Sequence, residues 1–352
     1  MNTDAVTAEA VANEAASTAT AATWGAHLDD RPVTIAVGPT AIAVVGGEGT
    51  VLIVNACGVT LGTATIPVGG LVASWSPDGR QLGLGGPTGA AIWTLDTGLT
   101  PLPQQGWCGA LAWCSDGRLA AATDRVVNVY SPSSDTATPE LSWQTPAVDS
   151  TVTGVAWLRD GRELAVAAYG GVRCFTQGKS KPAQRFDYVG SLLDIAASSD
   201  GRWLVSGNQD ASVHIWRMRD GDELEMSGFP GKVSAVEFHS AGRWLYADGG
   251  DQPTIWDFAG SGPGGRQPAM LHLRGLVGST RYAWHPTEPL IAAADSIGEI
   301  SLWDPSALAA GELNPPHVTV TSAGEPVTAL AWFNTEALIV ATESGGIFFL
   351  GP

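Results

Sequence analysis

The sequence predicts an all-β fold built from repeated units, on the strength of two recurring landmarks. A tryptophan stands three residues before an Asp-Gly-Arg turn at Trp75, Trp113 and Trp157. Each turn is followed by a run of small apolar residues and then by a segment that ends in a second large apolar residue, 17 to 19 residues after the first landmark. A period of about 40 residues with this internal order is typical of circular or solenoid repeats.

Eight units follow one another along the chain. The first landmark falls at Val37, Trp75, Trp113, Trp157, Ala197, Phe238, Trp284 and Trp332. The second falls at Val54, Trp93, Tyr130, Phe175, Trp216, Trp256, Trp303 and Leu350. In the fifth unit, strands are expected over 192–197, 203–206 and 213–216, with turns at 200–202 and 208–210. An Asp-Gly pair between such runs is a strong hairpin signal.

A weaker fourth strand lies between one unit and the next, as at 223–226 and 270–273. Four antiparallel strands in each repeat make a propeller blade, and eight blades are favoured, with seven as the alternative. The last unit ends without a fourth strand, whereas a spare strand precedes the first. Trp24 stands nine residues before Val33, as Trp143 stands nine residues before Val152. Residues 22–27 are therefore expected to complete the last blade and close the ring, which removes open sheet edges.

These motifs resemble the WD-repeat (WD40) family of β-propellers. Trp256-Asp257 and Trp303-Asp304 match its closing dipeptide, and residues 76–79 match its first turn. The resemblance covers residues 22–352, after a polar tail at 1–21 that is expected to be flexible. The family's Gly-His is absent, so its hydrogen-bonded tetrads are expected to be incomplete, with Asp210 and Asp124 the best-preserved members. The resemblance implies a protein-interaction scaffold.

Charge and composition limit the classes of partner that the protein is expected to bind. A net charge of −17 argues against nucleic acid, and the short basic segment 179–185 is interpreted as a solvated loop. No apolar run approaches the roughly 18 residues of a membrane span. Residues 1–22 lack the features of a secretory signal, and the four cysteines form no disulfide framework. We therefore expect a cytoplasmic protein whose partner is another protein.

No motif predicts catalysis, a cofactor or a metal site. Gly178-Lys179-Ser180 lacks the helix of a phosphate-binding loop, and the glycine-rich segment 260–265 lacks the helix of a dinucleotide site. No spacing of histidines suits a metal ion. The alternative is a small-molecule-binding or catalytic propeller with its site in the central funnel. The inner ends of the first strands argue against it, because they carry small residues, at Gly109, Ser191, Ser234 and Ser279.

One face of the ring is expected to bind the partner. The loops before each first strand and those between second and third strands share this face, called the top; the Asp-Gly-Arg turns share the bottom. The top loops hold twelve acids and five bases, which suggests docking of a basic protein segment, although turn aspartates also serve their own backbones. Aromatic residues in these loops are candidate anchors, unless they pack locally. The predicted partner-binding residues are Trp107, Tyr169, Tyr188, Phe229, Asp248, Asp251, Arg274 and Arg281.

Overall fold

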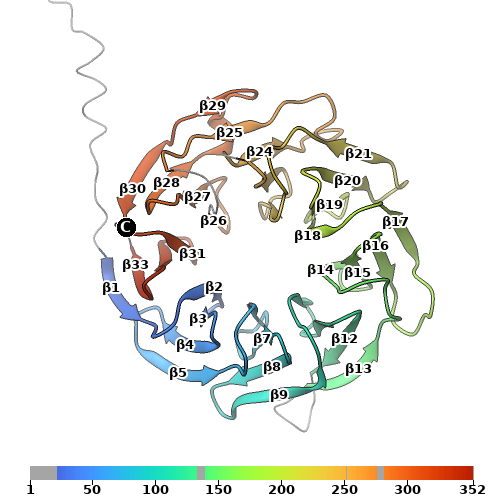
Figure 1. The fold of residues 1–352 in the computed structure, drawn as a ribbon, viewed down its shortest axis with the longest axis horizontal. Coiled ribbons are helices and arrows are strands. Elements are labelled where there is room, and N and C mark those ends of the chain that lie inside the picture. Colours follow the sequence, from blue (N-terminus) through green and yellow to red (C-terminus); the bar gives the residue numbers. More distant parts are fainter. Residues whose placement is uncertain (1–21, 133–138, 251, 276–280, 352) are drawn as a thin grey trace, which may run out of the picture.

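Eight β-sheets stand around a central axis in the computed structural model, which describes residues 22–132, 139–250, 252–275 and 281–351 (Figure 1). Each sheet is one blade, and its first strand lies nearest the axis. The sequence prediction of an eight-bladed propeller of antiparallel sheets is confirmed.

The first five blades follow the chain without interruption, each with four strands. Blade 1 has β2 (Pro32–Val37), β3 (Ala41–Gly46), β4 (Thr50–Asn55) and β5 (Thr60–Thr65). Blade 2 has β6 (Val72–Trp75), β7 (Leu82–Gly86), β8 (Gly89–Thr94) and β9 (Gly98–Gln105). Blade 3 has β10 (Leu111–Trp113), β11 (Leu119–Thr123), β12 (Val126–Ser131) and β13 (Glu140–Gln144). Blade 4 has β14 (Gly154–Leu158), β15 (Glu163–Ala168), β16 (Gly171–Phe175) and β17 (Gln184–Asp187). Blade 5 has β18 (Leu192–Ala197), β19 (Trp203–Asn208), β20 (Val213–Arg217) and β21 (Glu223–Met226).

The last three blades contain the departures from this simple order. Blade 6 has β22 (Val236–Phe238), β23 (Trp244–Ala247), β24 (Thr254–Asp257), β25 (Ala269–Leu271) and a fifth strand, β29 (Leu313–Asn314). Blade 7 has β26 (Arg281–Trp284), β27 (Ile291–Ala294), β28 (Glu299–Trp303) and β30 (Val318–Ser322). Blade 8 has β31 (Val327–Phe333), β32 (Ala337–Thr342), β33 (Gly346–Leu350) and β1 (Ala22–His27).

The N-terminal strand closes the ring. β1 pairs antiparallel with β33, with Gly25 opposite Phe348. The indole of Trp24 stacks on Phe349 at 5.1 Å between ring centroids, and its Nε1 donates to the carbonyl oxygen of Ala56 in blade 1 at 2.8 Å. The predicted role of residues 22–27 as the outer strand of the last blade is confirmed.

β29 is a feature that the repeat pattern did not predict. The segment between β28 and β30 passes through a short 3₁₀ helix, η1 (Pro305–Ala307), and reaches back to blade 6, where β29 runs parallel to β25. Asn314 stabilises the conformation of this segment, because its side-chain amide donates to the carbonyl oxygens of Ala309 and Glu312. Trp303 Nε1 donates to the carbonyl oxygen of Asn314 at 3.1 Å.

The first-landmark tryptophans join neighbouring blades. Each indole Nε1 donates to a backbone carbonyl oxygen on the first strand of the preceding blade, at 2.9–3.2 Å. The pairs are Trp75 to Ala36, Trp113 to Ser74, Trp157 to Ala112, Trp284 to Glu237 and Trp332 to Ala283. Hydrophobic clusters fill the space between blades, as where Ile53 of blade 1 and Leu84 of blade 2 share one cluster. Each fully buried large apolar side chain stabilises the fold by about 1.5–3 kcal/mol.

Blade 5 contains a hydrogen-bonded network in which tyrosine takes the place expected of histidine. The Tyr188 hydroxyl donates to the carboxylate of Asp210. Ser212 Oγ donates to Asp210 at 2.7 Å and accepts from the Asn208 amide at 3.1 Å. Ser206 Oγ donates to Asn208 Oδ1 at 3.0 Å. The network expected to lack one member is therefore completed by a residue from the loop before the first strand.

Candidate functional site

Acidic side chains tie the two kinds of top loop to each other. In blades 1, 3, 5, 6, 7 and 8, an acid on one loop accepts hydrogen bonds from the other loop of the same blade. The pairs are Asp30 with Glu48, Asp124 with Trp107, Asp210 with Tyr188, Asp248 with Ser234, Asp295 with Gly275 and Glu325 with Ser344. Half of the acids counted on this face thus act as acceptors for the loops themselves.

Two of the four predicted aromatic anchors are exposed. Trp107 exposes 44% of its surface and Tyr169 exposes 53%. Tyr188 is half-buried, bonds to Asp210 and packs on the His214 ring, with 4.3 Å between centroids. Phe229 is half-buried against the hydrophobic cluster between blades 5 and 6. The structure therefore places Trp107 and Tyr169 where a partner can reach them and uses Tyr188 and Phe229 in local packing.

The charged residues predicted to bind a partner do not all lie at one site. Asp248 and Arg281 line a cavity of about 280 Å³ that is bounded by blades 6, 7, 8 and 1. Arg281 Nε donates to the carbonyl oxygen of Thr328 at 2.6 Å. Arg274 is exposed and pairs with Glu299 at 3.5 Å. Asp251 lies outside the described residues.

Two exposed valines on the top face were missed by the sequence reasoning, which considered only aromatic residues. Val68, before the first strand of blade 2, exposes 75% of its surface, and Val189, before that of blade 5, exposes 92%. Val68 also has a φ of +68°, which is strained for a β-branched residue. The signal that could have found them is an apolar residue beside glycine in a loop, as in Val68-Gly69 and Val189-Gly190.

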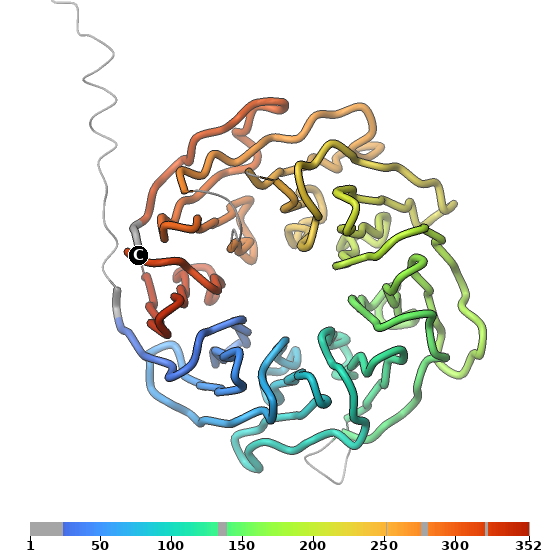
Figure 2. Tube along the Cα trace, in the orientation of Figure 1, coloured from blue at the N-terminus to red at the C-terminus, as the bar shows by residue number. Residues whose placement is uncertain are grey.

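The top loops of blades 2–5 form a continuous belt. Gly106 N donates to the carbonyl oxygen of Thr88 at 3.2 Å, and Val152 N donates to that of Asp124 at 2.7 Å. Tyr169 N donates to Ser150 Oγ at 2.8 Å, and Gly170 N donates to the carbonyl oxygen of Gly190 at 3.1 Å. Val68, Trp107 and Val189 stand in the loops before the first strands of blades 2, 3 and 5, and Tyr169 stands in the loop between the second and third strands of blade 4. We call these four residues the apolar arc; the segment that carries them, residues 68–189, runs from light blue to yellow-green in Figure 2.

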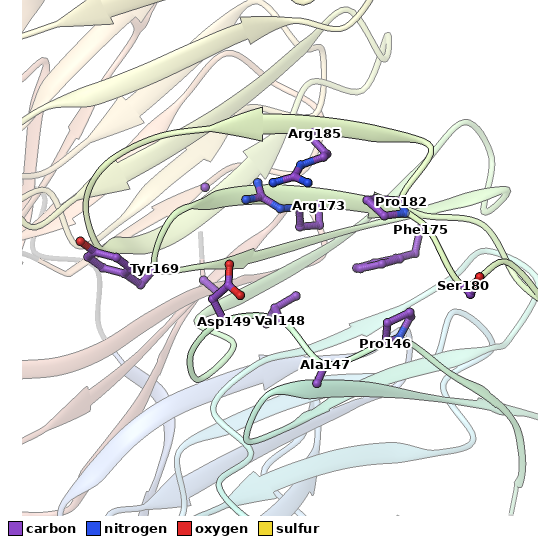
Figure 3. A pocket seen from close by; sticks show the side chains of 12 residues that line it. Pro146, Ala147, Val148, Asp149, Tyr169, Arg173, Phe175, Ser180, Pro182 and Arg185 are labelled. Carbon is purple, nitrogen blue, oxygen red and sulfur yellow. The ribbon is translucent and has the colours of Figure 1, made fainter.

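A pocket of about 200 Å³ opens beside Tyr169 (Figure 3). Arg173 and Arg185 lie on one wall, and Pro146 and Val148 lie on the opposite wall, with Tyr169 at one end. The Arg173 guanidinium pairs with Asp187 at 2.8 Å, which fixes its orientation. The pocket extends the arc, with the two arginines on one wall and with Asp149 between Tyr169 and Val148 on the other side.

Polar side chains on the first strands of blades 5–7 line the central channel. The sequence analysis did not predict them, because it considered only the small residues at the inner ends of these strands, such as Ser191 and Ser234. Ser279 lies outside the described residues. Asp194 Oδ2 accepts from Val236 N of the next blade at 3.0 Å. The Glu237 side chain is exposed to the channel, yet the neighbouring blades remove part of its hydration, which raises its pKa to about 7 against the opposing effect of a hydrogen bond with Tyr282. Desolvation likewise raises the pKa of Asp194 to about 6. These side chains also join neighbouring blades, so the channel cluster serves the fold.

The cysteines are free thiols. Cys57 is exposed and the other three are buried; burial raises the pKa of Cys108 and of Cys174 to about 12. Within the described ranges, no group of three or more His, Cys, Asp or Glu side chains is placed to hold a metal ion. In the same ranges, no helix is long and apolar enough to cross a membrane.

Comparison with known proteins agrees with the architecture. The model of the WD domain, G-beta repeat, matches residues 183–217, which run from the outer strand of blade 4 through the third strand of blade 5. The chain is a β-propeller that contains a WD40 repeat. This WD40 propeller is 26% identical, over 155 residues, to the ribosome biogenesis protein ERB1 of Coprinopsis cinerea. That match covers 43% of the chain and 19% of the relative.

Solved propellers share the fold of the whole ring. The computationally designed Ika8 protein has a TM-score of 0.72 at 17% identity, over 93% of this chain and 98% of its own. The Dos1 propeller has a TM-score of 0.73 at 14% identity, over 93% of each chain. WD40 propellers generally act as protein-interaction scaffolds, and the WD40 fold of this chain is suited to the same role.

Proposed function

We propose that this WD40 propeller is a non-catalytic interaction platform and that its partner protein docks on the apolar arc of the top face. The observation that carries the proposal is the position of Val68, Trp107, Tyr169 and Val189 on one continuous belt of loops. Exposed apolar side chains that gather on one face favour a site of interaction. Trp and Tyr side chains dominate the binding energy of protein interfaces.

The backbone at Val68 supports this choice of surface. A β-branched side chain at positive φ is disfavoured, and this one is exposed, so it gains little from packing in the free protein. Strain of this kind is concentrated at functional sites. A partner that contacts Val68 would bury this side chain, which is exposed in the free protein.

The partner that fits this surface has apolar side chains for the arc and a basic segment for its rim. Asp149, exposed beside Tyr169, and the net charge of −17 attract such a segment. The field increases the rate of encounter, while the buried apolar contacts determine the lifetime of the complex. The same charge disfavours nucleic acid as the partner, and the proposed location is the cytoplasm.

Binding measurements with alanine variants test the docking surface. The partner is captured from the native organism and identified, and its affinity is measured for Trp107→Ala and Tyr169→Ala. Leu95→Ala is the matched control, because Leu95 is 67% exposed on a bottom loop. Removal of a true anchor costs about 2 kcal/mol or more, which is about a 30-fold loss of affinity. Equal affinities for all three variants, or a loss confined to Leu95→Ala, would overturn the proposal.

A further inference from the structure

A second pocket lies on the opposite, bottom face of the ring, under blade 5. Its volume is about 410 Å³, and its charged lining residues are all arginines: Arg159, Arg202, Arg217 and Arg219. No acidic side chain lines it. The chain has 35 acidic and only 18 basic residues, so four arginines around one pocket run against the composition.

Loops of blades 4 and 5 supply these arginines, and a loop of blade 6 completes the pocket. Arg159 stands in the first turn of blade 4 with a φ of +51°, and Arg202 stands in the corresponding turn of blade 5. Arg217 is the last residue of β20, the strand labelled in Figure 1, and Arg219 follows it by two residues. Gly260 of blade 6 completes the wall, and its carbonyl oxygen accepts from Arg202 at 3.0 Å.

Acids outside the pocket orient the arginines without occupying it. Asp220 accepts from Arg217 at 2.8 Å and from Arg219 at 2.9 Å. Asp200 pairs with Arg202 at 2.5 Å, and Glu163 pairs with Arg159 at 3.4 Å. Among the described residues, each of the four guanidinium groups retains at least one terminal nitrogen that donates no hydrogen bond. The pocket therefore presents donors that are already held in place.

The floor of the pocket is apolar. Trp203 and Met218 lie there, and both side chains are buried. Trp203 Nε1 has no acceptor within the described part of the chain. Charge attraction is stronger beside such a floor than in open water, because the local dielectric constant is lower.

We propose that this pocket binds a small phosphorylated molecule with more than one phosphate group. Guanidinium groups match phosphate oxygens in geometry and donate two hydrogen bonds at once. The volume falls within the range of about 300–1,000 Å³ that is usual for small-molecule sites, and it exceeds the space that a single phosphate fills. The donors come from three separate segments, which suits a ligand whose charge is spread over several groups. The site is separate from the apolar arc and does not depend on the proposed partner.

Calorimetric titration with tripolyphosphate tests the proposal. Saturable binding at micromolar concentration is expected, with weaker binding of inorganic phosphate, which fills only part of the pocket. Citrate serves as a carboxylate of similar charge. Binding of citrate as tight as that of tripolyphosphate would contradict the assignment to phosphate, and no saturable binding of tripolyphosphate below the millimolar range would overturn the site.

Variants locate the binding on the protein. Arg159→Gln and Arg219→Gln each remove an exposed guanidinium, and each is expected to weaken tripolyphosphate binding about tenfold. Arg80→Gln is the matched control, because Arg80 is exposed in the turn of blade 2 that corresponds to the turn of Arg202. An equal loss of affinity in Arg80→Gln would show that tripolyphosphate responds only to overall charge, and the pocket assignment would then be wrong.

Discussion

The backbone amide of Trp107 donates a hydrogen bond to Oδ1 of Asp124 at 3.0 Å, and the amide of Asp124 returns one to the carbonyl oxygen of Trp107. Asp124 itself has a φ of +50°, in the left-handed region. One acid on the second loop thus holds the first loop in the shape that exposes the Trp107 indole. The Asp124 carboxylate therefore has a structural role on this face, since it fixes the loop that carries an apolar side chain. This role is independent of any attraction between its charge and a partner.

Substitution of Asp124 separates these two contributions. Asp124→Asn keeps an acceptor and tolerates the positive φ, so stability and partner affinity are expected to stay near those of the wild type. Asp124→Ala loses both features, and unfolding free energy is expected to fall by about 1–2 kcal/mol, with weaker partner binding. Chemical denaturation and partner titration give the comparison. An Asn variant that binds as weakly as the Ala variant would show that the charge itself is what the partner recognises.

Ring closure predicts a sharp difference between two truncations. Deletion of residues 1–20 is expected to leave the melting temperature nearly unchanged, because β1 begins at Ala22. Deletion of residues 1–29 removes β1 and exposes the edge of β33, so the melting temperature and solubility are expected to fall. Thermal melts and sedimentation of the two proteins measure this. Identical melting curves would mean that closure contributes nothing.

The indole bonds between blades predict the effect of removing a single N–H. Trp75→Phe keeps an aromatic ring at the boundary of blades 1 and 2 but removes the donor to Ala36. The expected cost is about 1 kcal/mol for the hydrogen bond, in addition to the packing lost with the smaller ring. Phe238 is a native example of a landmark without this donor. Denaturation midpoints at constant m-value measure the difference, and a Phe variant as stable as the wild type would contradict the role given to these bonds.

The pH dependence of stability tests the environment of Glu237. Its pKa is raised to about 7 in the folded protein, so the folded state holds the proton more tightly than the unfolded state does. Stability is therefore expected to fall as pH rises from the ordinary glutamate value to about 7, and to change no further above that. Glu237→Gln, which cannot ionise, is expected to be more stable than the wild type at pH 8 by about 1 kcal/mol, after allowance for screening by channel water. At pH 4 the two proteins should differ little; a constant difference across this range would contradict the raised pKa.

Local periodicity was enough to predict the blades and the closing strand. Strand positions follow from alternation and turn residues, and the register match between Trp24 and Trp143 follows from the repeat itself. The strand β29 was not predictable in this way, because it pairs with β25 only where the long segment between β28 and β30 returns to blade 6, outside the repeat pattern.

The surface was predicted only in part, for a different physical reason. Trp107 and Tyr188 occupy similar loops in the sequence, yet one is exposed and the other bonds to Asp210, because the neighbouring loop decides which side chain is covered. The arginine pocket was missed, since its residues come from turns that each appear unremarkable alone. The acceptor role of the top acids agrees with the alternative drawn from the sequence, that turn aspartates serve their own backbones, although charge counts alone did not show which acids do so.

Hydrogen–deuterium exchange of the propeller with and without its captured partner tests the docking surface most directly. We predict slower exchange over 67–70, 106–109, 148–152, 168–171 and 188–191, the top loops around the apolar arc, and no change over the bottom loops at 95–98 and 217–222. Protection confined to the bottom loops, with exchange at the arc unchanged, would contradict the account.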